Sequence, residues 1–107
     1  MKTYDVETEW ATYPNCYFQV SRYKANDSLA LQLWNEEDGP IARLTVCLPD
    51  AKYQPKPNEA YVDVNNCPWA MNFIKENDLG EDTGLVGFSG FCTYPLVAFD
   101  MDLLQMR

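Results

Sequence analysis

The chain contains no histidine. Histidine is the side chain whose charge changes near neutral pH, and it is the commonest general acid or base and metal ligand. Its absence excludes Ser-His and Cys-His nucleophile pairs and every histidine-based metal centre. An enzyme built on this chain would have to use carboxylates, cysteine, lysine or tyrosine. We therefore predict no catalytic residues and favour a non-enzymatic role, although the sequence leaves enzymatic activity open.

Close cysteine pairs are also missing. The chain has four cysteines, Cys16, Cys47, Cys67 and Cys92, and none of them form the C-x-x-C pair that is typical of structural zinc sites. We expect reduced thiols that pack as small core side chains, and we predict no metal and no cofactor. A metal site, a disulfide or a reactive thiol is the alternative for these residues.

Long apolar runs are missing as well. No run approaches the roughly 20 residues that span a bilayer, and the N-terminal sequence MKTYDVETEW lacks the apolar segment of a signal peptide. A chain of 107 residues, 47% of them hydrophobic, has room for one small packed core. These features predict a single domain over residues 1–107, a cytoplasmic location and no membrane partner.

Basic residues are scarce. Lysine and arginine together number 8 against 16 aspartates and glutamates, which gives a net charge of -8 and an isoelectric point near 4.2. Such a charge opposes direct binding to the phosphate backbone of nucleic acids. We predict a protein partner instead, one with a basic surface. The sequence indicates no oligomeric state.

Alternating apolar and polar residues predict several strands. They are expected at Tyr4–Trp10, Cys16–Tyr23, Ser28–Glu36, Ile41–Leu48, Ala60–Val64, Leu85–Thr93 and Leu96–Phe99. A turn is expected at Tyr13-Pro14-Asn15, and Tyr94-Pro95 is expected to interrupt the strand pattern between the last two strands. The Asp38-Gly39 pair predicts a hairpin between the third and fourth strands. In the sixth, Gly87 or Gly90 is expected at a bulge or a close backbone approach.

One segment has the spacing of an amphipathic helix. Trp69, Ala70, Phe73 and Ile74 form an apolar stripe, which predicts a helix over about 67–78. Asn66 or Cys67 is the expected N-cap, and Gly80 is the expected left-handed residue that closes the helix. Asp100 is expected to cap a short C-terminal helical turn. The fold class is therefore α+β, an antiparallel, largely sequential sheet of about five to seven strands with this helix packed on one face.

Acidic residues gather at two places in the predicted sheet. Asp5, Glu7 and Glu9 share one face of the first predicted strand, where side chains repeat at about 7 Å, and Glu36, Glu37 and Asp38 precede the hairpin glycine. Together they form a candidate interaction surface, and in its sharpest version the surface mimics DNA and occupies a nucleic-acid-binding protein. The alternative is an ordinary solvent face whose charges protect a sheet edge.

A second candidate site lies in the predicted loop 78–84. Asp78, Glu81 and Asp82 are hard oxygen ligands, so the alternative function is a carboxylate-based metal-binding protein or enzyme centred on this loop, although the spacing of a calcium-binding EF-hand is not met. Asp82-Thr83-Gly84 has the triplet of dimeric aspartic proteases but stands too late in the chain for their fold. Asn65, Asn66, Trp69 and Tyr94 would form a ligand pocket only if they converge.

Several segments together resemble a known family. They are residues 26–31 (NDSLAL), 44–48 (LTVCL), 59–69 (EAYVDVNNCPW), 79–84 (LGEDTG) and 89–95 (SGFCTYP). They are similar to small bacterial domains of unknown function that occur on mobile elements of gut bacteria, and the resemblance covers nearly the whole chain. It implies no activity and no catalytic residue. It does imply a context in which small acidic proteins often inhibit host defence nucleases.

Overall fold

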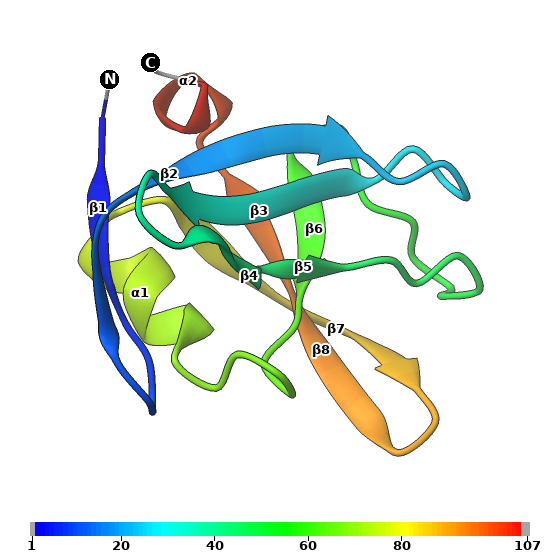
Figure 1. Ribbon diagram of the computed structural model, residues 1–107. Coiled ribbons are helices and arrows are strands. Elements are labelled where there is room, and N and C mark those ends of the chain that lie inside the picture. Colours follow the sequence, from blue (N-terminus) through cyan, green and yellow to red (C-terminus); the bar gives the residue numbers. More distant parts are fainter. Residues whose placement is uncertain (1, 106–107) are drawn as a thin grey trace.

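The structure, a computed structural model, describes residues 2–105 as two antiparallel four-stranded sheets and two short helices (Figure 1). The first sheet has the order β1-β2-β3-β4 and the second has the order β5-β6-β8-β7. The elements are β1 (Tyr4–Glu7), β2 (Thr12–Arg22), β3 (Leu29–Asn35), β4 (Gly39–Arg43), β5 (Thr45–Val46), β6 (Glu59–Val62), α1 (Ala70–Glu76), β7 (Gly80–Ser89), β8 (Cys92–Phe99) and α2 (Met101–Leu104). The α+β content is confirmed, but the prediction of a single sheet of five to seven strands is wrong.

The first sheet follows the chain in order, as expected. In β3 the buried Leu29, Leu31 and Leu33 alternate with positions on the other face, and the predicted hairpin from β3 to β4 is confirmed. The turn predicted at Tyr13-Pro14-Asn15 is wrong, because these residues lie inside the long strand β2. Asn15 there has a positive φ of 55°, opposite a shift in the pairing register between β1 and β2. The sequence signal marks an irregularity within a strand.

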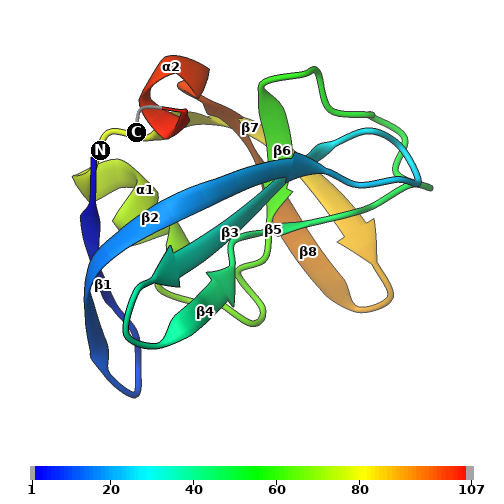
Figure 2. The ribbon, with the colours of Figure 1, turned by 45° about the horizontal axis from the view of Figure 1, so that its top comes forward.

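The chain crosses between the two sheets at Leu44. A continuous strand over Ile41–Leu48 was predicted, but the segment divides into β4 in one sheet and β5 in the other. The Leu44 N–H donates to the carbonyl of Leu31 at 2.9 Å, and the Leu44 carbonyl accepts from the Asp63 N–H at 2.9 Å. Leu44 thereby pairs with both sheets, and its buried side chain belongs to the core between them. Figure 2 shows β4 and β5 following one another across this junction.

The second sheet contains the segment that was predicted as an acidic loop. Strand β7 already begins at Gly80, so Glu81 and Asp82 lie in a strand paired with Ala98 and Val97. Gly80 is not the left-handed helix terminator, since Asp78 has that conformation, with φ of 54°. A Cβ at Gly80 would lie 2.6 Å from the Ala98 carbonyl oxygen, so strand packing requires the glycine. Tyr94 and Pro95 do not interrupt β8.

The helices are shorter than the sequence pattern suggests. Helix α1 begins at Ala70 after Trp69, later than the predicted start at 67, because Cys67 and Pro68 belong to the preceding turns. Its buried side chains are Ala70, Phe73 and Ile74, which confirms the apolar stripe. The capped turn at the C-terminus is also confirmed, since the Asp100 carboxylate accepts from the Leu103 N–H in α2. Among residues 2–105 no helix is long and apolar enough to cross a membrane.

The cysteines divide into two classes. All four are free thiols, and Cys16 and Cys67 are buried in the main core, as predicted. Cys47 and Cys92 are only partly buried. The pKa of Cys16 and of Cys67 is raised to about 11, chiefly by burial and to a smaller extent by nearby carboxylates, those of Asp5 and Asp38 for Cys16 and that of Asp63 for Cys67. These two thiols are therefore held in their neutral form.

Candidate functional site: an acidic pocket between β1 and α1

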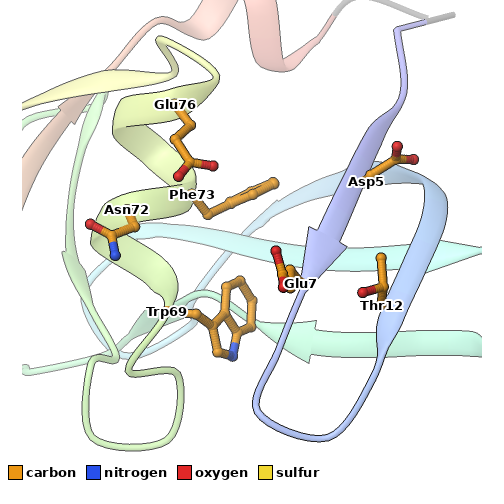
Figure 3. A pocket seen from close by; sticks show the side chains of 7 residues that line it. All are labelled: Asp5, Glu7, Thr12, Trp69, Asn72, Phe73 and Glu76. Atoms are coloured by element: carbon orange, nitrogen blue, oxygen red, sulfur yellow. The ribbon is translucent and has the colours of Figure 1, made fainter.

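A pocket of about 430 Å³ opens between strand β1 and helix α1 (Figure 3). We call it the acidic pocket, and its lining residues are Asp5, Glu7, Thr12, Trp69, Asn72, Phe73 and Glu76. Three of these side chains carry carboxylates, and none of the lining residues is a lysine or arginine. Figure 3 shows Phe73 extending from α1 toward β1, with Glu76 above it on the same helix. The pocket thus concentrates negative charge beside aromatic rings.

The pocket rests on a cluster of aromatic side chains. Phe73 is buried, and its ring centroid lies 6.0 Å from that of Tyr4 and 6.3 Å from that of Phe18. The Trp69 ring stands edge-on to Phe73, with centroids 5.9 Å apart and an interplanar angle of 77°. Edge-to-face pairs of this kind contribute about 0.5–1.5 kcal/mol beyond their buried area. They hold α1 against β1 and β2 and so fix the walls of the pocket.

Strand and helix periodicity explain why the carboxylates converge. In β1, Tyr4 and Val6 point into the core, so the alternate residues Asp5 and Glu7 are exposed on the other face. In α1, Asn72 and Glu76 are one helical turn apart and exposed on the same side. Glu7 and Glu76 therefore face the pocket from its two walls. The side-by-side placement predicted for Asp5 and Glu7 is confirmed.

Glu9 does not belong to this face. Strand β1 ends at Glu7, and Glu9 lies in the turn to β2, which is closed by the Thr8 side chain. The predicted strand Tyr4–Trp10 is too long because Thr8 bonds the backbone of its own turn, with the Thr8 hydroxyl donating to the Ala11 carbonyl at 3.0 Å. Trp10, the last residue of that predicted strand, is 88% exposed. Of the three acidic residues predicted on one strand face, only Asp5 and Glu7 lie there.

The second predicted acidic group lies near the first. Glu36, Glu37 and Asp38 occupy the exposed turn between β3 and β4, and Glu36 and Glu37 line a hollow of about 150 Å³ together with Pro14 and Asn15 of β2. The Asn15 N–H donates to Asp5 Oδ1 at 3.2 Å, so Asn15 joins the two acidic groups. Asp38 has a structural contact, because its carboxylate accepts from the buried Asn35 amide at 3.2 Å.

The alternative site, Asp78, Glu81 and Asp82, does not converge on one point. Asp78 follows α1, whereas Glu81 and Asp82 are consecutive residues of β7 and so point to opposite faces of the strand. The Asp82 carboxylate accepts from the Gly84 N–H at 2.9 Å and closes an irregularity within β7. Within residues 2–105 no group of three or more Asp, Glu, Cys or His side chains is placed to hold a metal ion.

Sequence reasoning missed part of the acidic pocket. Asn72 and Glu76 lie outside the predicted apolar stripe of the helix, and nothing in their spacing shows that they lie opposite β1. Trp69 was assigned to a possible ligand set with Asn65, Asn66 and Tyr94, and the structure separates this set. Trp69 lines the acidic pocket, whereas Tyr94 packs with Leu48, Tyr61 and Leu96 in the second core cluster.

An exposed apolar surface lies at the opposite end of the molecule. Leu85, Val86 and Phe88 of β7 and Phe91 in the following turn are all exposed. Gly87 between them is buried, and a Cβ there would lie 2.7 Å from Leu48 Cδ1 and 2.8 Å from Tyr61 Cε1. The predicted close approach at Gly87 is therefore confirmed. A hollow of about 390 Å³ beside β7 is lined by Tyr53, Tyr61 and Leu85 among others.

Comparison with known proteins identifies a family but no activity. No curated protein and no solved structure matches the chain. One family model matches residues 16–107, which include α1 and the whole second sheet and leave out β1 with Asp5 and Glu7. The family is described as a domain of unknown function, in agreement with the resemblance seen in the sequence. The chain therefore belongs to the DUF4313 family.

Proposed function

We propose that this chain is a non-enzymatic protein-binding module whose acidic pocket receives a lysine or arginine side chain of a basic partner. The observation that carries the proposal is the placement of Asp5, Glu7 and Glu76 around one pocket with the indole of Trp69 at its wall. Carboxylates accept the N–H groups of a guanidinium or ammonium, and an indole face attracts the same cation. The pocket is thus matched in charge and chemistry to a basic side chain.

The charge of the whole chain supports the same proposal. A net charge of -8 creates a field that attracts a positively charged partner and raises the rate of encounter. The half-exposed Trp69 adds the apolar surface that is enriched at protein interfaces. The net charge thus brings a basic partner to the chain, and the acidic pocket makes the specific contact with its lysine or arginine side chain.

Calorimetric titration with a capped tri-arginine peptide tests the proposal, and a capped tri-citrulline peptide of the same shape measures binding that does not depend on charge. We expect the arginine peptide to bind and the citrulline peptide not to bind. Replacing Asp5→Asn, Glu7→Gln and Glu76→Gln together should weaken arginine-peptide binding by about 3-fold to 100-fold, because exposed charge pairs contribute about 0.2–1 kcal/mol each.

A matched control separates the pocket from the net charge. Asp27→Asn, Asp50→Asn and Asp102→Asn together remove the same amount of charge from residues that do not line the pocket. This control should retain most of the peptide affinity. Equal weakening by both triple variants would show that the peptide responds only to overall charge, and the pocket proposal would then be wrong.

The DNA-mimic version of the proposal uses a larger surface. It is favoured by the proximity of Asp5 to the turn with Glu36 and Glu37 through Asn15, which makes the acidic surface continue beyond the pocket. In this version the chain is a mobile-element inhibitor that occupies the phosphate-binding surface of a host nucleic-acid-binding protein. It requires that duplex DNA and this chain compete for the captured partner, and a partner without affinity for DNA would exclude it.

A cytoplasmic location is part of the same proposal. Its support is the chemistry of the cysteines, since all four are free thiols and Cys16 and Cys67 are buried in the core. Free thiols without disulfides are the usual state of proteins in a reducing compartment.

A further inference from the structure

Strand β7 is the outermost strand of the second sheet, and its outer half carries no charge. Natural edge strands are usually protected by charged residues, prolines or a covering segment. From Thr83 to Phe99 the chain has no charged residue, although the whole chain carries 24 charged residues as 8 basic and 16 acidic ones. Val86 is 49% exposed and Phe88 is 66% exposed. In Figures 1 and 2 the β7–β8 hairpin extends away from the first sheet.

The hairpin geometry shows which backbone groups face the open edge. Ser89 pairs with Cys92 across the turn residues Gly90 and Phe91, and Gly90 has a φ of 59° that fits the first central position of a type II′ turn. The pair that closes such a turn is hydrogen-bonded, and the pairs alternate from there. Phe88 and Val86 therefore occupy non-hydrogen-bonded positions toward β8, and their N–H and C=O groups point to the open edge.

A proline in β8 agrees with this alternation. Val86 is opposite Pro95, which has no N–H to donate. At a non-hydrogen-bonded pair Pro95 needs no N–H to donate to Val86, so the proline costs the ladder no hydrogen bond. The outer edge of β7 thus offers two complete sets of donors and acceptors, separated by Gly87.

We propose that this edge pairs with the same edge of a second copy of the chain, antiparallel and about a two-fold axis at Gly87. In this register the backbone groups of Val86 exchange hydrogen bonds with those of Phe88 of the second copy, and the reverse. The side chains of Val86 and Phe88 then form aromatic–β-branched cross-strand pairs. An antiparallel pair of identical strands is self-complementary, as a two-fold interface must be.

The distribution of charge favours pairing with a second copy at this edge and opposes it at the acidic surfaces of the chain. Two chains of net charge -8 repel one another, so they can approach closely only where both surfaces are neutral. Antiparallel pairing also places Glu81 and Asp82 of one copy at the opposite end from those of the other. Parallel pairing would place like charges side by side, which is destabilising. Beside this part of β7 the only charged residues that line the hollow are Asp50 and Lys52, whose charges are opposite, so a basic partner finds no net negative charge there. This edge lies apart from the acidic pocket.

Sedimentation equilibrium of the full chain tests the proposal. The regular part of the edge is short, so we expect a reversible dimer of the 12.3 kDa chain with a dissociation constant on the order of 100 µM. Phe88→Glu should weaken dimerisation at least about tenfold. Trp10→Glu is the matched control, because it makes the same kind of change at an 88% exposed aromatic residue outside the second sheet, and it should leave the dimer unchanged.

Amide exchange of the unmodified chain supplies a second readout that does not depend on a variant. As concentration rises from about 10 µM to about 1 mM, the amides of Val86 and Phe88 should become protected while those of β1 do not change. A chain that remains monomeric at about 1 mM overturns the proposal and leaves this edge to a strand of another protein. A dimer that forms without protecting these two amides, or that Phe88→Glu and Trp10→Glu weaken equally, also overturns it.

Discussion

The two edge strands β1 and β7 expose opposite kinds of side chain, acidic in β1 and apolar in the outer half of β7. Each is the last strand of a four-stranded sheet and exposes one row of side chains. In β1 that row is Asp5 and Glu7, whereas in the outer half of β7 it is Val86 and Phe88. Carboxylates on an edge repel an incoming strand, and apolar side chains favour one. The difference shows how one small domain can present an electrostatic surface at one end and a strand-pairing surface at the other.

The structural support beside the two edge strands also differs. Beside β1, helix α1 is held by the rings of Phe73 and Trp69 and adds Glu76 to the acidic side. Beside the outer half of β7, by contrast, the hairpin rests on Leu48 and Tyr61 through the buried Gly87 of β7 and through Tyr94 and Leu96 of β8. The acidic pocket is therefore held by packing between a helix and a strand, whereas the outer half of β7 belongs to a hairpin that extends from the molecule.

The largest expected difference comes from the same substitution in the two regions. Phe73→Ala removes a buried ring that contacts Tyr4, Phe18 and Trp69, and we expect it to lower the free energy of unfolding by about 3–5 kcal/mol. Phe88→Ala removes an exposed ring and should change it by less than about 0.5 kcal/mol. Urea unfolding at a concentration where the chain is monomeric measures both. Comparable losses would mean that Phe88 is part of the core, and the contrast would fail.

A smaller effect is expected from adding a methyl group at two glycines of β7. Gly87→Ala forces a Cβ against Leu48 and the fully buried Tyr61, so we expect a loss of about 1–3 kcal/mol. At Gly84 no atom lies within 4 Å of the added Cβ, but φ is 85°, so Gly84→Ala should cost only the backbone strain of about 1–2 kcal/mol. Thermal unfolding of both variants measures the difference. A more harmful Gly84→Ala would show that the hairpin is not anchored through Gly87.

The last effect appears only at high pH. The pKa of Cys16 and of Cys67 is raised to about 11 in the folded chain from an ordinary value of 9.0, chiefly by burial. The folded state then keeps a proton that the unfolded state releases, so the associated stability is complete below pH 9 and is lost as pH rises toward about 11. Burial also raises the pKa of Tyr4 and of Tyr61, in the same direction.

Urea unfolding between neutral pH and about pH 10.5 measures how the two thiols contribute to the pH dependence of the free energy of unfolding. Cys16→Ala and Cys67→Ala together should make the fall in the free energy of unfolding with pH shallower than in the parent chain. Cys47→Ala, which removes a partly buried thiol just after β5, is the control variant. An unchanged pH slope in the double variant would show that the two thiols are not held neutral by the fold.

Local patterns predicted much of the first sheet and little of the second. The alternation of leucines in β3, the Asp-Gly hairpin and the Asp100 cap act between residues close in the chain, and all were predictable. The crossing at Leu44 was not, because hydrogen bonds to both Leu31 and Asp63 decide it. Likewise the acidic segment after α1 became part of β7 because β8 pairs with it, against its low strand propensity.

The candidate site was predictable on one wall only. Strand alternation placed Asp5 and Glu7 on a common face, as found, whereas Glu9 was lost because the Thr8 side chain closes a turn before it. The other wall depends on where α1 packs, which the rings of Tyr4, Phe18 and Phe73 decide in three dimensions. The exposure of Val86 and Phe88 was equally hidden, since an apolar strand in a sequence gives no sign that it lies at an edge.

One measurement tests directly whether the two regions act separately. Amide and indole N–H resonances of the chain are followed during titration with the capped tri-arginine peptide at a low chain concentration. We predict shifts at the Trp69 indole and at Asp5, Glu7 and Glu76, with the resonances of Val86 and Phe88 unchanged. Shifts centred on β7, or spread evenly over the acidic residues with Trp69 unmoved, would contradict the assignment of cation binding to the pocket between β1 and α1.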